Sequence, residues 1–238
     1  MTEWFEEWFG EEYLHLYPHR NDTEAGRLIG LLVRTLPWRS GWLVLDAACG
    51  AGRHLLALEH AGARPFGFDL SAALLRRARE ASRRPLVRAD LRAIPFRRAS
   101  MDLTVNLFTS FGYFADDEQH HDALGEMLAT VRPGGWFVMD FLNAEQVRGS
   151  LVAEERVGFG SVMAEVHRAI SIDQRFVCKT IRLPGGRQFQ ERVRLLDPAD
   201  LERMFEAHGA TMRYRFGDYD GAALGQGPRT ILLTQVPE

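Results

Sequence analysis

The chain has 238 residues, enough for one large domain with a sizeable core, and its formal net charge is −3. This near-neutral balance provides no global field that would by itself imply a nucleic acid or an acidic substrate. With only two cysteines, Cys49 and Cys178, an acidic N-terminus and no long apolar run, the sequence predicts a cytoplasmic protein without a disulfide framework or membrane contact.

The N-terminal segment, residues 1–39, predicts a helical lid. Over residues 2–17 the aromatic side chains at positions 4, 5, 8 and 9 fall on one face of a helix, and acidic residues occupy the opposite face. Tyr17 and Arg20 follow directly, and they combine aromatic surface with hydrogen-bond donors, so we count both as candidate cofactor contacts. A second helix, capped at residues 21–23, is predicted to end at Pro37.

A strand, a glycine turn, a helix and a second strand then predict a nucleoside-binding unit. The strand covers residues 42–47, the helix 53–60 and the second strand 64–69. Gly50 and Gly52 would let the backbone approach a ligand, and Asp69 would accept hydrogen bonds from two ribose hydroxyls. A dinucleotide fingerprint would need a small residue where Leu55 stands, which ranks an oxidoreductase last.

The alternation continues and predicts an α/β fold with a doubly wound, mostly parallel sheet of seven strands. Residues 86–90, 101–108 and 136–141 are the next strands, and two helices, 71–82 and one from about residue 116 to the Pro-Gly-Gly turn at 133–135, connect them. Residues 149–196 instead show short alternating strands without helices, which predicts a small antiparallel β insertion after strand five that covers the substrate. A helix over 197–208 and strands at 210–216 and 229–236 complete a core of residues 40–148 and 197–238.

Several segments of this core resemble the motifs of class I S-adenosylmethionine-dependent methyltransferases. The acid and glycine turn at 46–54 resembles the first motif, with Ala48 in place of its first glycine. Residues 67–71 resemble the ribose-binding strand end, and 88–91 the segment whose acid bonds the adenine amino group. Residues 101–106 and 132–135 resemble the fourth strand and the Pro-Gly-Gly turn. The resemblance implies that fold, S-adenosyl-L-methionine as cofactor, and these cofactor-binding residues: Asp46, Ala48, Gly50, Gly52, Arg53, Asp69, Leu70, Asp90, Leu91 and Asn106.

The loop after the fourth strand, residues 106–114, bears on the acceptor. It lacks the Asn-Pro-Pro-Tyr type of sequence with which methyltransferases of base amino groups hold a planar nitrogen, and it offers aromatic and hydroxyl groups instead. Alignment and exclusion of water can supply much of the acceleration of methyl transfer, so a dedicated base is optional. Tyr113, His120 with its neighbour His121, and Asp140 are the candidate bases. Asp140 and Asn143 lack a third oxygen ligand, so no metal is predicted.

We therefore predict a methyltransferase that acts on a small-molecule acceptor. An RNA methyltransferase is the first alternative, because arginines are dense between residues 76 and 98, although the acidic N-terminal arm makes a nucleic-acid partner the less favoured interpretation. A module that binds the cofactor without transferring its methyl group is the second. The sequence leaves the oligomeric state open, and a homodimer is compatible with it.

Overall fold

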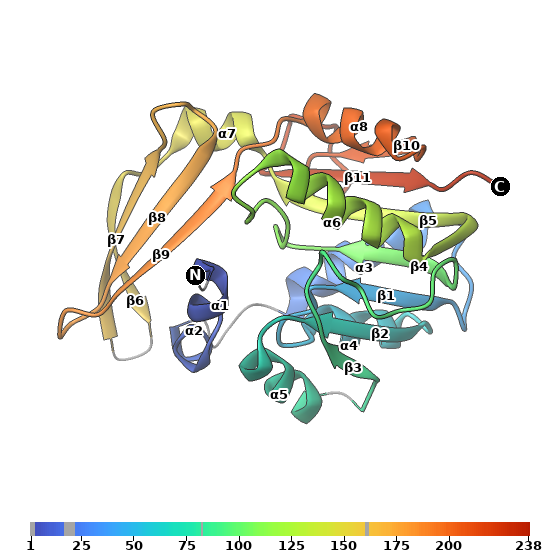
Figure 1. The fold of residues 1–238 in the computed structure, drawn as a ribbon, viewed down its shortest axis with the longest axis horizontal. Helices are drawn as coiled ribbons and strands as arrows, with labels where there is room; N and C mark the ends of the chain where they lie inside the picture. The colour runs from blue at the N-terminus through green and yellow to red at the C-terminus, as the bar shows by residue number, and fades with distance from the viewer. Residues whose placement is uncertain (1–2, 17–21, 82, 160–161) are drawn as a thin grey trace.

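The computed structural model describes residues 3–16, 22–81, 83–159 and 162–238, and it contains two sheets (Figure 1). The larger sheet has seven strands: β1 (Leu43–Ala47), β2 (Arg64–Asp69), β3 (Leu86–Arg88), β4 (Met101–Asn106), β5 (Val131–Leu142), β10 (Thr211–Phe216) and β11 (Arg229–Gln235). Their order is β10-β11-β5-β4-β1-β2-β3, and β11 alone runs antiparallel to both of its neighbours. The predicted seven-stranded, mostly parallel sheet is thus confirmed.

The strand order places a binding crevice at one edge of this sheet. The chain proceeds outward from β1 through β2 to β3 and then returns to the other side of β1 with β4. At such a reversal the connections leave toward opposite faces, so that the carboxyl ends of β1 and β4 border an open crevice. The residues that follow β1, β2, β3 and β4 therefore meet along a single rim.

Helices cover both faces of the sheet, and β1 shows why. Its consecutive residues Val44 and Leu45 are both fully buried, and they point to opposite faces. Val44 belongs to a core cluster with Leu28 and Leu32 of α3 (Asp22–Thr35), and α4 (Arg53–His60) adds to the same cluster. Leu45 belongs to the cluster of α6 (Asp117–Thr130) and α8 (Pro198–Ala207). Helix α5 (Ala72–Ala81) packs along β2 and β3.

The smaller sheet is the predicted antiparallel insertion. Its strands β6 (Glu154–Phe159), β7 (Val162–Ile170), β8 (Phe176–Arg182) and β9 (Gln188–Arg194) pair in chain order. Figure 1 shows the helices α1 (Trp4–Trp8) and α2 (Glu11–Leu16) between this sheet and the carboxyl rim of the larger one. Trp8 fixes α1 to β9, because its indole donates a hydrogen bond of 2.7 Å to Glu191 and its ring lies 4.6 Å from that of Phe189.

The structure corrects two local predictions and adds a helix that was not predicted. The helix expected over residues 2–17 is two short helices, because the chain leaves the helical conformation at Phe9 and Gly10 follows, a residue that disfavours helix interiors. Strand β5 begins at Val131, before the Pro-Gly-Gly turn, since Val131 pairs with Met101 of β4. An unpredicted helix, α7 (Ala144–Ser150), begins where the Asn143 side chain accepts a hydrogen bond from the Gln146 amide. None of the helices in the described ranges is long and apolar enough to cross a membrane.

Candidate functional site

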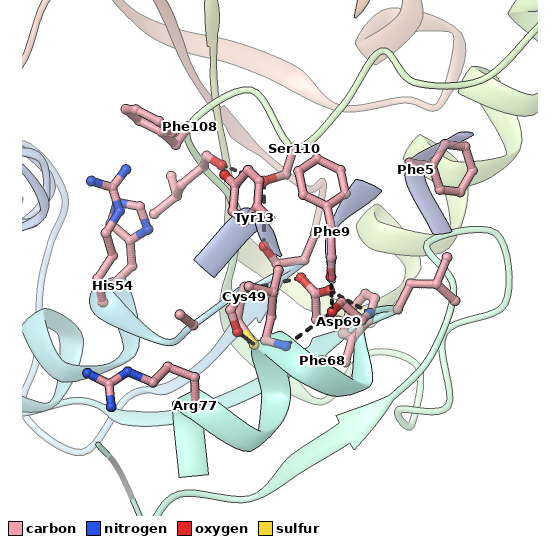
Figure 2. A pocket seen from close by; sticks show the side chains of 18 of the residues that line it. Phe5, Phe9, Tyr13, Cys49, His54, Phe68, Asp69, Arg77, Phe108 and Ser110 are labelled. Carbon is pink, nitrogen blue, oxygen red and sulfur yellow. Dashed lines mark hydrogen bonds between the residues drawn. The ribbon is translucent and has the colours of Figure 1, made fainter. Parts of the chain in front are cut away.

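A cavity of about 860 Å³ lies at the carboxyl rim of the large sheet, beneath α1 and α2 (Figure 2). Its wall combines residues after β1, β2, β3 and β4 with side chains of the two N-terminal helices. Ligand pockets commonly measure about 300 to 1,000 Å³, so this cavity can hold a nucleoside together with a second small molecule.

The turn after β1 exposes backbone to the cavity. Gly50 and Gly52 have φ angles of +54° and +85°, in the left-handed region that favours glycine. An added Cβ at Gly50 would meet a protein atom only at 3.9 Å, so the space it would fill is open to a ligand. Ala48 shares this conformation with φ at +62°, which explains why the family motif has glycine there. Gly52 lies behind the wall, where a Cβ would come within 3.1 Å of Ala78.

Asp69, at the end of β2, is held in place by the backbone. Its two carboxylate oxygens accept hydrogen bonds of 2.8 Å from the amides of Gly50 and Ser71. Burial raises the pKa of Asp69, and these amides act in the opposite direction. The Leu70 backbone also stabilises this carboxylate, which has about four acceptor sites and so retains capacity for a hydroxyl of a ligand.

Two predicted contacts, Asp46 and Asn106, lie behind the cavity wall. Asp46 is 1% exposed, and its Oδ2 has no hydrogen-bond partner among the described residues. Burial, and then the negative charge of Asp69, raise the pKa of Asp46 to about 7, although Arg53 opposes the shift. The side-chain amide of Asn106 donates a hydrogen bond of 3.0 Å to the Ala47 carbonyl, and this bond joins β4 to β1 below the turn.

Arg53 reaches the wall from the first turn of α4. Its guanidinium lies 4.1 Å above the ring of Phe108 and pairs with Glu24 at 2.9 Å. The Nη2 atom is buried and has no partner within the described part of the chain. A guanidinium with an unused donor suits an anionic group of a ligand, such as a carboxylate.

The opposite wall of the cavity is aromatic. It is lined by Phe5 of α1, Tyr13 of α2 and Phe9 between these helices. Tyr113 and Phe114, from the loop after β4, complete it. The Tyr113 ring lies 5.7 Å from that of Phe9 and 6.2 Å from that of Phe5. Figure 2 shows Phe5, Phe9 and Tyr13 turned toward the same pocket as Asp69. Such rings exclude water, and their faces attract cations.

Of the three candidate bases, the structure brings only Tyr113 to the cavity wall. His120 is 1% exposed, packs between the rings of Phe111 and Phe114, and contacts the Asp116 carbonyl through Nδ1 at 2.7 Å. Burial lowers the pKa of His120, which keeps the ring neutral. Its neighbour His121 lies near His208, at a ring distance of 5.7 Å.

Asp140 is fully buried on β5, and its carboxylate is occupied by three donors. It accepts hydrogen bonds from Arg229 Nε at 2.7 Å, from the Tyr219 hydroxyl at 2.9 Å and from the Phe108 amide at 2.9 Å. Phe108 and Thr109 have φ angles of +58° and +60°, which is costly for residues other than glycine. These contacts give Asp140 a structural role, because it stabilises the conformation of the loop after β4.

The cavity wall thus contains seven of the predicted cofactor contacts: Ala48, Gly50, Arg53, Asp69, Leu70, Asp90 and Leu91. Tyr17 and Arg20 fall outside the described residues. Sequence reasoning missed His54 and Ser110 in the wall, as well as Arg92 beside it. Within the described ranges, no cluster of three or more histidine, cysteine, aspartate or glutamate residues could hold a metal ion.

Comparisons with known proteins agree with this geometry. Residues 44–135 match a family model described as "Methyltransferase domain". A curated relative from Streptomyces fradiae, a dTDP-3-amino-3,6-dideoxy-alpha-D-glucopyranose N,N-dimethyltransferase, is 28% identical over 86% of this chain and 83% of its own length. A tRNA (carboxymethyluridine(34)-5-O)-methyltransferase from Arabidopsis thaliana is 27% identical over 64% of this chain, which spans only 41% of that relative. The crystal structure of an S-adenosylmethionine-dependent methyltransferase from Clostridium acetobutylicum superposes with a TM-score of 0.81, at 16% identity, over 95% of this chain and 98% of that one.

Proposed function

We propose that this chain, which matches a methyltransferase domain model over residues 44–135 and has the class I methyltransferase fold, uses S-adenosylmethionine to methylate an amino group of a small-molecule acceptor. The observation that carries the proposal is the division of one cavity into a polar rim and an aromatic wall. The rim suits the cofactor, and the aromatic wall suits the acceptor.

The rim residues fit S-adenosylmethionine. Asp69 is held by backbone amides and can still accept a hydrogen bond from the ribose hydroxyls, and Asp90 can accept one from the adenine amino group. Gly50 leaves open the space beside the turn, and the unpartnered Nη2 of Arg53 suits the carboxylate of the methionyl part. When bound, this cofactor supplies an electrophilic methyl group on a positively charged sulfur.

The aromatic wall supports an amine as the acceptor. Phe5, Phe9 and Tyr113 exclude water, and their ring faces can stabilise positive charge at the reacting centre. A neutral amine is already nucleophilic, so these residues mainly need to align it. The Tyr113 hydroxyl is the group that we assign to orient the amine or to take up its proton, because among the bases expected from the sequence it alone lines the cavity and it lies within the aromatic wall. The name of the Streptomyces relative, an N,N-dimethyltransferase of an amino sugar, agrees with this class of acceptor.

Ion pairs reduce the positive charge that the arginine-rich stretch, residues 76–98, can offer to RNA. Four of its nine arginines pair with carboxylates in the described structure: Arg77 with Glu80, Arg84 with Glu59, Arg92 with Glu3 and Asp90, and Arg98 with Glu126. Arginines whose charge is balanced by neighbouring carboxylates offer little net attraction to a phosphate backbone.

The test is an acceptor panel. The protein is incubated with S-adenosylmethionine and either 3-amino or 4-amino sugar nucleotides, the corresponding hydroxy sugars, or bulk tRNA, and products are identified by mass spectrometry. We expect S-adenosylhomocysteine and an N-methylated product only with amino sugars. Methylated tRNA, or methylated hydroxy sugars with unreacted amines, would contradict the proposal. Cofactor binding without turnover in any arm would favour a module that only binds the cofactor.

A further inference from the structure

Arg92 lies just after β3, next to the cavity, and all of its side-chain donors are engaged. It donates from Nε and Nη2 to Asp90 at 3.0 and 2.7 Å, from Nη1 and Nη2 to Glu3 at 3.3 and 2.6 Å, and from Nη1 to Gln119 at 2.8 Å. These are five hydrogen bonds, and a guanidinium has five N–H groups. The three acceptors come from the cavity rim, the beginning of α1 and the first turn of α6.

The first consequence concerns Asp90, which lines the cavity. Its Oδ1 accepts two hydrogen bonds, from the amide and from Nε of Arg92, whereas Oδ2 accepts one. A carboxylate oxygen offers about two lone pairs, so Oδ2 retains one site for a donor of a ligand. Burial opposes ionisation, but the hydrogen bonds from Arg92 outweigh it and lower the pKa of Asp90. Asp90 therefore remains a carboxylate anion, which can accept hydrogen bonds but cannot donate them. This favours a ligand with an amino group at this position over one with a carbonyl oxygen.

The second consequence concerns α1. Glu3 is the residue at the N-terminal cap of this helix, and the next turn carries Phe5 of the aromatic wall. The Arg92 guanidinium also lies 4.8 Å above the ring of Phe114, which packs edge-on against Phe5 at 6.1 Å. Arg92 thus contacts both the polar group that begins α1 and the ring on which α1 rests.

We propose that Arg92 is a positioning residue that couples recognition of the adenine amino group at Asp90 to closure of α1 over the cavity. The inference rests on the proposed function, because it assumes that the adenosyl group binds at Asp90. Since one guanidinium holds both groups, a ligand that orders Asp90 also orders Glu3, and by linkage a docked α1 strengthens ligand binding.

The test compares two ligands whose bases differ in the group at position 6 and, as a consequence, in the hydrogen on the adjacent N1. Calorimetry measures the affinity of S-adenosylhomocysteine and of S-inosylhomocysteine, which carries an oxygen where adenine carries its amino group. Hydrogen exchange of the peptide covering residues 3–9 reports on α1. The variants are Arg92→Met and Glu3→Gln, and Arg98→Met is the matched control, because its arginine is 72% exposed and pairs only with Glu126 among the partners described.

We expect the wild-type protein to prefer the adenosyl ligand and to protect residues 3–9 when it binds. Arg92→Met should weaken adenosyl binding by about tenfold or more, change inosyl binding much less, and abolish the ligand-induced protection. Glu3→Gln should keep the preference for adenine but reduce the protection, and Arg98→Met should behave as wild type. Equal losses for both ligands in Arg92→Met, or protection that survives in both variants, would overturn the coupling. If Arg92→Met does not fold, unchanged protection in Glu3→Gln still overturns it. Failure of the wild-type protein to bind either ligand would instead refute the proposed function.

Discussion

Asp46 gives a prediction with a definite sign in its dependence on pH. This buried carboxylate has an oxygen without a partner in the described structure, and its pKa is raised from 3.8 to about 7 by burial and by the charge of Asp69. The folded protein therefore binds a proton at Asp46 more tightly than the unfolded chain does. Its contribution to stability falls as the pH rises from about 4 through about 7.

The magnitude follows from the shift. About three pKa units correspond to a penalty of about 4 kcal/mol once the group is ionised in the folded state. Between about pH 5.5 and pH 8.5, the wild-type protein should lose about 2 kcal/mol through this group. Asp46→Asn removes the charge and nearly preserves the shape, so the variant should lack this loss.

The assay is denaturant unfolding of both proteins at the two pH values. We expect the variant to gain about 2 kcal/mol relative to wild type on going from pH 5.5 to pH 8.5. Asp220→Asn, at a carboxylate that is 68% exposed, is the control and should show no comparable change. A variant whose stability relative to wild type is the same at both pH values would refute the reasoning, and so would one that loses relative stability at pH 8.5.

Three further predictions concern the rim and the loop after β4. Asp69→Ala should weaken the binding of S-adenosylhomocysteine by about 1 to 3 kcal/mol, because charge-assisted hydrogen bonds are lost, and unchanged affinity in calorimetry would rule out the ribose assignment. Arg229→Met should lower the free energy of unfolding by about 3 to 5 kcal/mol, because it leaves the buried Asp140 without its cation. Arg215→Met, at a more exposed pair, should cost less than about 1 kcal/mol, and equal losses in the two variants would contradict this account of Asp140. Tyr113→Phe should lower kcat by about 100-fold or more with little change in cofactor affinity if the hydroxyl handles the acceptor proton, whereas an unchanged kcat would leave Tyr113 only a packing role.

Much of the cofactor rim was predictable because parallel strands impose it. Asp69 ends β2, while Gly50 and Asp90 follow β1 and β3, and the carboxyl ends of these strands share one edge whatever their distance in sequence. The same rule misplaced Asn106, because it gives the end of a strand but not the direction of a side chain that bonds the neighbouring Ala47 carbonyl.

The aromatic wall and the role of Asp140 could not be derived in this way. The apolar face of residues 4–9 indicated a buried helix, but local periodicity does not specify that its rings meet Tyr113, more than a hundred positions away. The position of Asp140 near the end of a strand predicts a base, but β11 pairs with β5 and brings Arg229 to this carboxylate. The role of Arg92 could not be predicted from the sequence, because its hydrogen-bond acceptors come from three separate segments of the chain.

The most direct test of the central claim is a crystal structure of the protein with S-adenosylhomocysteine. The account predicts that the ribose hydroxyls bond the Asp69 carboxylate, that the adenine amino group meets Asp90, and that the sulfur faces the ring of Tyr113. A ligand bound elsewhere, or one whose ribose lies away from Asp69, would contradict it.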